Sequence, residues 1–308
     1  MVAIDRILCP VDLSPCSQTA LRYASALARW YDASVTVLHV FRQAPLVDTA
    51  AAGLGGAIYA PPLALADVDR EALCRRVTEF VAQTPDAGTA ALQICEGVNL
   101  REEILREAAA LPADLLVLGS HGLTGMQRLV LGSTAENVLR HATTPTLVVP
   151  VHAPDVPAAG VPFKRILCAV GFEADSYNAL RYAFDLAQES DAQLTLLHAV
   201  EMPTVHVGAE DLIYTYDLET ARGTVMRDAR ARLEALVPEA ARASCTVHVE
   251  VAEGRAHEVV LQLATEVDAD LIIMGVRDRD AFDVAVFGSH AQAVVRGAHC
   301  PVLTVHQE

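Results

Sequence analysis

The chain has 308 residues and a formal net charge of −16, from 39 acidic and 23 basic side chains. A surface with this excess of negative charge repels the phosphate backbone of DNA and RNA, so we expect no nucleic-acid partner. The sequence shows no basic-then-apolar leader and no apolar run long enough to cross a bilayer, so we also expect no membrane anchor.

The first half alternates short apolar runs with longer segments of helical period, which is typical of βαβ units and a parallel sheet. The runs are almost continuously apolar, which indicates strands covered by helices on both faces. The predicted class is therefore α/β and doubly wound. Strands are expected near residues 5–11, 34–40, 90–95, 114–118 and 145–149, and helices near 15–31, 67–83, 100–110 and 133–141.

A glycine-spaced loop follows the fourth expected strand. Gly119 and Gly122 are separated by two residues, and nine more lead to Gly132-Ser133, where a helix is expected to start. Isolated glycines are usually turn residues. Between a strand and a helix, however, glycine lets the backbone approach a ligand, and the N–H groups at the helix start attract anions. The spacing matches neither the phosphate loop that ends in Gly-Lys-Ser/Thr nor the short Rossmann fingerprint. We predict that this loop binds a phosphate group.

The sequence also contains an internal repeat, and each half has the size of an ordinary domain. Predicted boundaries are a first domain at 1–150, a linker rich in proline and small residues at 151–162, and a second domain at 163–308. The repeated segments are Arg6–Val11 with Arg165–Val170, Ala20–Ala24 with Ala179–Ala183, and Gly132-Ser133 with Gly288-Ser289.

The loop and the repeat together resemble the universal stress protein family, in the subgroup that binds ATP. The resemblance covers nearly the whole chain. It implies, in each half, a Rossmann-like sheet of five parallel strands in the order 3-2-1-4-5. Ligands of such sheets bind beyond the carboxyl ends of the strands, where the strand order reverses. From the resemblance and from the charge that the phosphates carry, the expected nucleotide-binding residues are Pro10, Val11, Asp12, Val40, Leu118, Gly119, His121, Gly122, Arg128, Gly132, Ser133 and Thr134.

Within this set, the resemblance places Asp12 near the base and ribose and Val40 at the adenine. The glycines and Ser133 are implied to contact the phosphates and ribose. Asp12 has an alternative role as a turn or N-cap residue. Ser14 is better placed to cap the helix that Pro15 opens, which leaves the carboxylate of Asp12 for a ligand.

The phosphates of ATP need positive partners, and lysine occurs in this chain only at Lys164, in the second half. We therefore expect backbone N–H groups, the hydroxyls of Ser133 and Thr134, His121, Arg128 and a magnesium ion carried by the nucleotide to balance the charge. Arg128 has an equal alternative as a solvated surface residue. No catalytic acid, base or nucleophile accompanies the set, which predicts slow hydrolysis at best.

The second half departs from the nucleotide signature. Gly171 stands in place of Asp12, and Asp278 stands in place of the second glycine. A carboxylate at that position repels phosphate, so we expect a degenerate site there. Arg277 and Arg279 are the alternative, because arginine could restore anion binding.

Cysteine and histidine spacing predicts no structural metal. The seven cysteines are an odd number without a Cys-x-x-Cys pair, which favours free thiols in a reducing, cytoplasmic interior. His39 and His198 occupy equivalent apolar strands and are expected to be hydrogen-bonded core residues. The cysteines expected in or beside strands, packed as small apolar groups, are Cys9, Cys95, Cys168 and Cys245.

The function that these features favour is a stress-response protein that binds ATP as a regulatory ligand in its first domain. Two alternatives stay open. One is a slow ATPase or a related adenine nucleotide hydrolase. The other is a module that binds an apolar ligand or a protein partner through the second domain.

The last strand of each half is apolar and is expected at a sheet edge, where strands associate. We predict that residues 145–150 and 301–305 lie side by side and form an intramolecular pseudo-dimer, with both clefts open to solvent. A flexible connection between the halves is the alternative, and a homodimer is a further one.

Overall fold

The computed structural model describes residues 2–42, 67–85, 87–122, 131–156, 163–202, 212–276 and 288–306. In the first half, the elements are β1 Arg6–Pro10, α1 Pro15–Tyr31, β2 Ser34–Arg42, α2 Asp67–Ala82, β3 Ala91–Gly97, α3 Leu100–Ala110, β4 Leu115–Gly119, α4 Ser133–Leu139 and β5 Thr146–Val149. In the second half, they are β6 Arg165–Ala169, α5 Ala174–Ser190, β7 Gln193–Val200, α6 Leu212–Ala235, α7 Glu239–Ser244, β8 Thr246–Glu253, α8 Ala256–Glu266, β9 Leu271–Val276, α9 Ser289–Gly297 and β10 Val302–His306.

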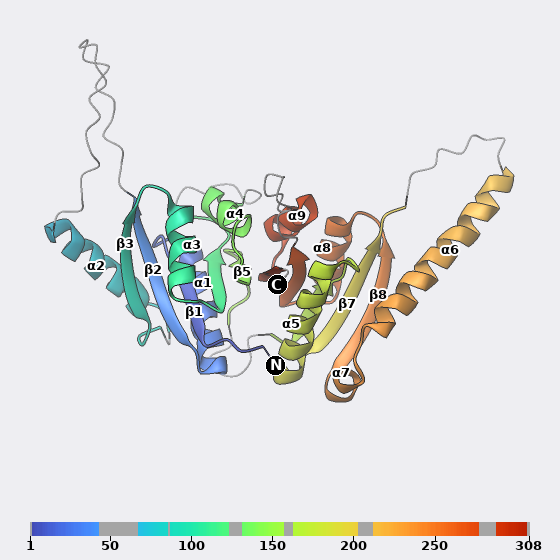
Figure 1. The fold of residues 1–308 in the computed structure, drawn as a ribbon, viewed down its shortest axis with the longest axis horizontal. Coiled ribbons are helices and arrows are strands. Elements are labelled where there is room, and N and C mark those ends of the chain that lie inside the picture. Colours follow the sequence, from blue (N-terminus) through green and yellow to red (C-terminus); the bar gives the residue numbers. More distant parts are fainter. Residues whose placement is uncertain are drawn as a thin grey trace, which may run out of the picture.

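The strands form one ten-stranded sheet in the order β3-β2-β1-β4-β5-β10-β9-β6-β7-β8. All neighbours are parallel except β5 and β10, which pair antiparallel with Leu147 opposite Leu303. The second half therefore repeats the strand order of the first half in reverse across this junction. Figure 1 shows the two halves facing each other, with β3 on the outer side of one and β8 on the outer side of the other. The predicted α/β class with a mainly parallel sheet is confirmed, and the two final strands lie side by side.

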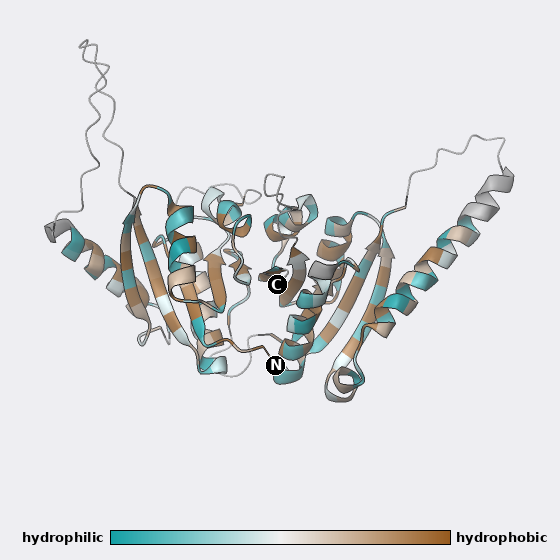
Figure 2. Cartoon of the chain, in the orientation of Figure 1, coloured by the Kyte–Doolittle hydropathy of each residue, from teal (hydrophilic) through white to brown (hydrophobic). Residues whose placement is uncertain are grey.

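The two faces of the sheet carry different cores, because successive strand side chains point to opposite faces. On β1, Ile7 and Cys9 belong to a core that runs through both halves, whereas Leu8 belongs to a smaller core with residues of α3 and α4. The matching core under α8 and α9 includes Leu167 of β6. Figure 2 shows the hydrophobic strands between helices with more polar outer surfaces.

Helix α1 begins with a reciprocal cap. Ser14 is the N-cap: its side chain accepts a hydrogen bond from the backbone N–H of Ser17, and the Ser17 hydroxyl accepts one from the backbone N–H of Ser14. Pro15 occupies the first turn. The expected capping role of Ser14 is thus observed. The preceding Leu13 has a φ of 65°, and its repeat equivalent Phe172 has a φ of 61°, so both halves make the same tight turn after the first strand.

Repeat-equivalent aspartates anchor the starts of the central strands. Asp114 accepts hydrogen bonds from the Arg6 guanidinium and from the backbone N–H groups of Asp5 and Arg6. Burial raises the pKa of Asp114, but these hydrogen bonds outweigh it and hold the pKa below its ordinary value. At Asp270, burial dominates and raises the pKa, although the backbone N–H groups of Lys164 and Arg165 oppose it.

Several contacts besides the strand pairing join the two halves. The Thr304 hydroxyl, fully buried, donates to the carbonyl of Thr146 at 3.2 Å. The Tyr31 hydroxyl at the end of α1 donates to Glu189 Oε2 of α5 at 2.7 Å. Burial, followed by this hydrogen bond, raises the pKa of Tyr31. The halves therefore share a core, a sheet and a polar contact, which argues against a freely flexible connection.

The cysteine predictions are borne out in part. Cys9 and Cys168 are fully buried in the central strands, and burial raises the pKa of each thiol to about 12. Cys95 and Cys245 are only half-buried, because they lie near the outer edges of the sheet rather than at its centre. Among the described residues, no helix is long and apolar enough to span a membrane.

Candidate functional site

The candidate site lies where three strands end. β1 is flanked by β2 and β4, so Asp12 after β1, Val40 on β2 and Gly119 at the end of β4 gather at one edge of the sheet. From β1 the chain adds β2 and β3 on one side of the sheet and then β4 and β5 on the other. Open α/β sheets bind ligands at the point where the strand order reverses in this way. The structure therefore brings together residues that lie far apart in the sequence.

Asp12 and Gly122 lie against each other across the end of the sheet. Asp12 Oδ1 accepts a hydrogen bond from the backbone N–H of Ser14 at 3.0 Å. A Cβ atom at Gly122 would lie 2.6 Å from Asp12 Oδ2, closer than real side chains come. Because glycine has no side chain, position 122 leaves room for the carboxylate of Asp12. Asp12 therefore has the turn role that was the alternative, through Oδ1, and it also presents Oδ2 to the glycine loop.

The other two glycines of the loop permit close packing. A Cβ at Gly119 would lie 3.0 Å from Cys16 Sγ and 3.1 Å from the Cys16 carbonyl carbon, because α1 starts directly against the end of β4. A Cβ at Gly132 would lie 3.2 Å from the Ser120 carbonyl oxygen, which accepts the Gly132 N–H at 2.8 Å. Gly119 thus lets α1 pack against the end of β4, and Gly132 lets the two ends of the loop meet. The spacing of the glycines in the sequence does not reveal these structural roles.

His121 places a polar ring beside this packing. Its Nδ1 lies 2.8 Å from the Ser120 hydroxyl, with either atom able to donate. Its Nε2 is buried and has no hydrogen-bond partner among the described residues. A buried ring nitrogen without a partner is costly unless another group completes its hydrogen bond. This nitrogen is the one polar side-chain atom of the predicted set that the described structure leaves buried and unsatisfied.

Four predicted residues form the walls of the site rather than its polar contacts. Both backbone groups of Val11 are hydrogen-bonded within the protein: its N–H donates to the Leu38 carbonyl at 2.8 Å, and its carbonyl accepts from His39 Nδ1 at 2.8 Å. Leu118 is buried, and Val40 packs half-buried against the same core. Pro10 is half-buried at the end of β1. His39, like His198 in the second half, is hydrogen-bonded as expected, although both are half-buried.

The start of α4 provides exposed donors at the same edge. Gly132 is the N-cap and offers no side chain to cap the helix, so the first-turn N–H groups are not satisfied by a side-chain cap. Ser133 is exposed and Thr134 is half-buried. Arg128 lies outside the described residues, so its two alternative roles remain a prediction.

The equivalent edge of the second half is built differently. Gly171 follows β6 where Asp12 follows β1, and its N–H donates to the Ser176 hydroxyl at 2.8 Å. Gly288 is the N-cap of α9, as expected from the repeat. The residues Arg277, Asp278 and Arg279 lie outside the described part of the chain, so the effect of Asp278 on phosphate remains a prediction.

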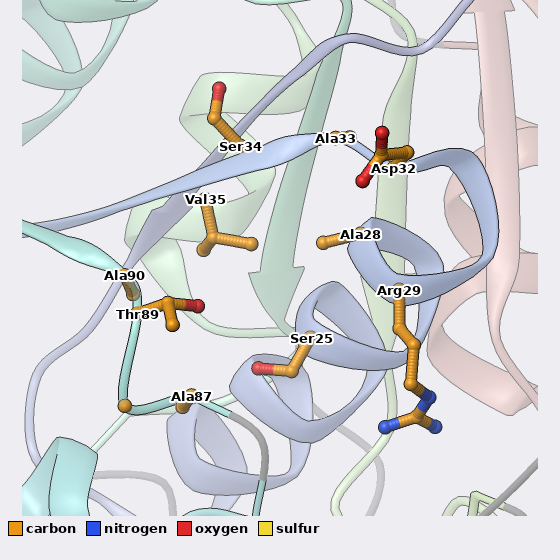
Figure 3. A pocket seen from close by; sticks show the side chains of 11 residues that line it. Ser25, Ala28, Arg29, Asp32, Ala33, Ser34, Val35, Ala87, Thr89 and Ala90 are labelled. Carbon is orange, nitrogen blue, oxygen red and sulfur yellow. The ribbon is translucent and has the colours of Figure 1, made fainter.

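A separate hollow of about 730 Å³ lies at the opposite edge of the sheet, near the end of α1 and the start of β2 (Figure 3). Its lining includes Ser25, Arg29 and Thr89, and none of the predicted nucleotide residues. The Ser25 hydroxyl is buried without a partner among the described residues. The glycine loop and this hollow therefore lie in different places, and we base the candidate site on the loop.

Sequence reasoning missed one pair of histidines. His257 of α8 and His290 of α9 lie side by side with their Nδ1 atoms 3.0 Å apart. They are 33 residues apart in the chain, too far for a local motif to reveal. The only signal available was that each is the second residue of a helix that follows a strand at the carboxyl edge of the sheet.

Comparisons with known proteins agree with this architecture. The universal stress protein family matches residues 3–150 and again residues 162–306. A universal stress protein of Mycolicibacterium smegmatis is 27% identical over 310 residues, covering 97% of this chain and 96% of that protein. The crystal structure of a universal stress protein from Archaeoglobus fulgidus DSM 4304 has 21% identity and a TM-score of 0.65, with 98% of each chain covered.

A shorter universal stress protein, solved in complex with cAMP, is 21% identical with a TM-score of 0.31 and covers 47% of this chain and 98% of its own. The family match is the stronger result, because it accounts for both repeats and for almost the full length of the chain. This chain belongs to the universal stress protein family, as a tandem of two such domains.

Proposed function

We propose that the first domain binds one adenine nucleotide, ATP with its magnesium ion, at the carboxyl edge formed by β1, β2 and β4, and that this ligand regulates a stress-response protein. The observation that carries the proposal is the contact between Asp12 and Gly122. Asp12 Oδ2 lies so close to Gly122 that a Cβ atom added there would be 2.6 Å from it, which leaves no room for a side chain.

The donor set fits a nucleotide. Asp12 can accept a hydrogen bond from a ribose hydroxyl or a base amine, and the wall of Val40 is apolar, as an adenine ring requires. The buried Nε2 of His121 and the uncapped N–H groups at Ser133 and Thr134 can donate to phosphate oxygens. The nucleotide would bring its own magnesium ion, which supplies charge neutralisation at the phosphates.

The second domain is proposed to have lost this site. It keeps the glycine that starts α9, but Gly171 removes the carboxylate that Asp12 provides in the first domain. Without that acceptor, a ribose or adenine has one fewer specific partner. The proposal therefore assigns nucleotide binding to the first half of the chain alone.

The test is to denature the purified chain and identify any released nucleotide by chromatography, followed by titration of nucleotide-free protein with ATP, ADP, AMP and cAMP. The proposal expects adenine nucleotide to bind, and it expects the Asp12→Ala variant to bind at least tenfold more weakly while remaining folded. Binding that is equally strong in a folded Asp12→Ala variant would contradict the assignment of the site.

A further inference from the structure

The second domain places two histidines together at its own carboxyl edge. His257 is the second residue of α8 and His290 is the second residue of α9, and these helices pack against each other (Figure 1). The two Nδ1 atoms are 3.0 Å apart, and the ring centres are 5.2 Å apart at an angle of 44°. The rings remain accessible, since 27% of the His257 side chain and 46% of the His290 side chain are exposed.

Each histidine also has a carboxylate near its other nitrogen. Glu201 Oε1 lies 3.6 Å from His290 Nε2, and Glu258 Oε1 lies 4.0 Å from His257 Nε2. Glu201 is held in position, because the same oxygen accepts the backbone N–H of Ala256 at 3.1 Å. A nearby carboxylate favours hydrogen on the ring nitrogen that faces it.

Two tautomer combinations of this pair are possible, and one of them turns both lone pairs inward. A neutral imidazole carries hydrogen on one nitrogen only, so two rings with hydrogen on Nε2 present two bare Nδ1 atoms to each other. At 3.0 Å one ring can donate to the other when it carries its hydrogen on Nδ1, whereas two bare Nδ1 atoms need a cation between them. Imidazole nitrogen with a carboxylate behind it is the usual ligand arrangement for zinc and its neighbours.

We propose that His257 and His290 bind a divalent transition-metal ion of the zinc class through their Nδ1 atoms, with the fixed carboxylate of Glu201 beside Nε2 of His290. Zinc–nitrogen bonds of about 2.0–2.1 Å in tetrahedral geometry separate two nitrogens by about 3.4 Å, so the rings need to open by only a few tenths of an ångström. The described residues offer no third ligand. Water therefore completes the coordination, and the ion is exchangeable.

The internal repeat relates the position of His290 to a residue of the first domain. Thr134 is the second residue of α4, and His290 is the second residue of the repeat-equivalent α9. The first domain thus has a hydroxyl at the helix start, where the nucleotide is proposed, while the second has a metal-binding ring. The metal site does not depend on the nucleotide proposal, because it rests on the geometry of the histidines alone.

The experiment is calorimetric titration of the intact, nucleotide-free chain with Zn²⁺, and separately with Mg²⁺, which prefers oxygen ligands. We expect one zinc site per chain that is weakened at least tenfold in His257→Ala and in His290→Ala, and by about tenfold in Glu201→Gln. Glutamine keeps an acceptor for the Ala256 N–H. The exposed His152 lies in the linker segment, and His152→Ala is the matched control that keeps the site.

Circular dichroism and thermal melting establish that each variant is folded. Zinc isotherms that are the same for the intact chain and for the folded His257→Ala and His290→Ala variants would overturn the proposal. So would the absence of any zinc heat in the intact chain, which would mean that a proton alone joins the two rings. Mg²⁺ binding that both histidine variants abolish would also contradict the assigned ligand class.

Discussion

Gly122→Asp tests the contact on which the nucleotide proposal depends. Any Cβ at this position would lie 2.6 Å from Asp12 Oδ2, so the carboxylate of Asp12 must move away from the loop. The new carboxylate also faces both Asp12 and the expected phosphates. Two like charges about 4 Å apart repel by about 4 kcal/mol at an effective dielectric constant of about 20. A tenfold loss of ATP affinity, about 1.4 kcal/mol, is therefore the smallest effect expected.

Two further variants separate the causes in the same calorimetric assay. Gly122→Ala introduces the steric contact without the charge, and we expect it to weaken ATP binding less than Gly122→Asp does. Gly88 is an exposed loop glycine at which an added Cβ would meet nothing within 4 Å, so Gly88→Asp controls for added negative charge. A folded Gly122→Asp protein that binds ATP as tightly as the Gly88→Asp control would refute the reasoning.

Two other predictions concern stability. Because folding lowers the pKa of Asp114, this carboxylate stabilises the folded state above the ordinary pKa of 3.8, and the stabilisation is lost as the pH falls through the folded pKa. Asp114→Asn should therefore lower the free energy of unfolding near neutral pH by about 1–3 kcal/mol, and the difference from the unmodified chain should shrink in acid. A difference that is independent of pH in urea titrations would contradict this. Tyr31→Phe removes the bond to Glu189 and should cost about 1–3 kcal/mol, whereas the control Tyr177→Phe, at a residue 52% exposed, should change stability by less than about 0.5 kcal/mol. Equal effects of the two tyrosine variants would show that the contact between the halves contributes nothing.

The sheet was predictable because its signals are local. The strands from Arg6, Ser34 and Leu115 are apolar runs bounded by helical segments, and the structure places them within one or two residues of the expected positions. The helix starts at Pro15 and Ser133 were equally clear, because proline and glycine act on the backbone of their own residues. The short helix α7 was not expected, since it has no counterpart in the first half.

The site was predictable only in outline. Sequence spacing identified the glycines, and the family resemblance assigned all of them to the ligand. In the structure, Gly119 and Gly132 also have packing contacts with Cys16 and Ser120. The contact between Gly119 and Cys16 joins β4 to α1 over about a hundred residues, and no local pattern encodes it. The pair His257 and His290 was missed for the same reason.

The most direct test of the account is the number of ATP molecules that bind to one intact chain. Calorimetric titration of nucleotide-free protein in the presence of Mg²⁺ should give one site per chain, because only the first domain combines Asp12 with the glycine loop. Two equivalent sites would contradict the loss of the second site, and no binding at all would contradict the proposed function itself.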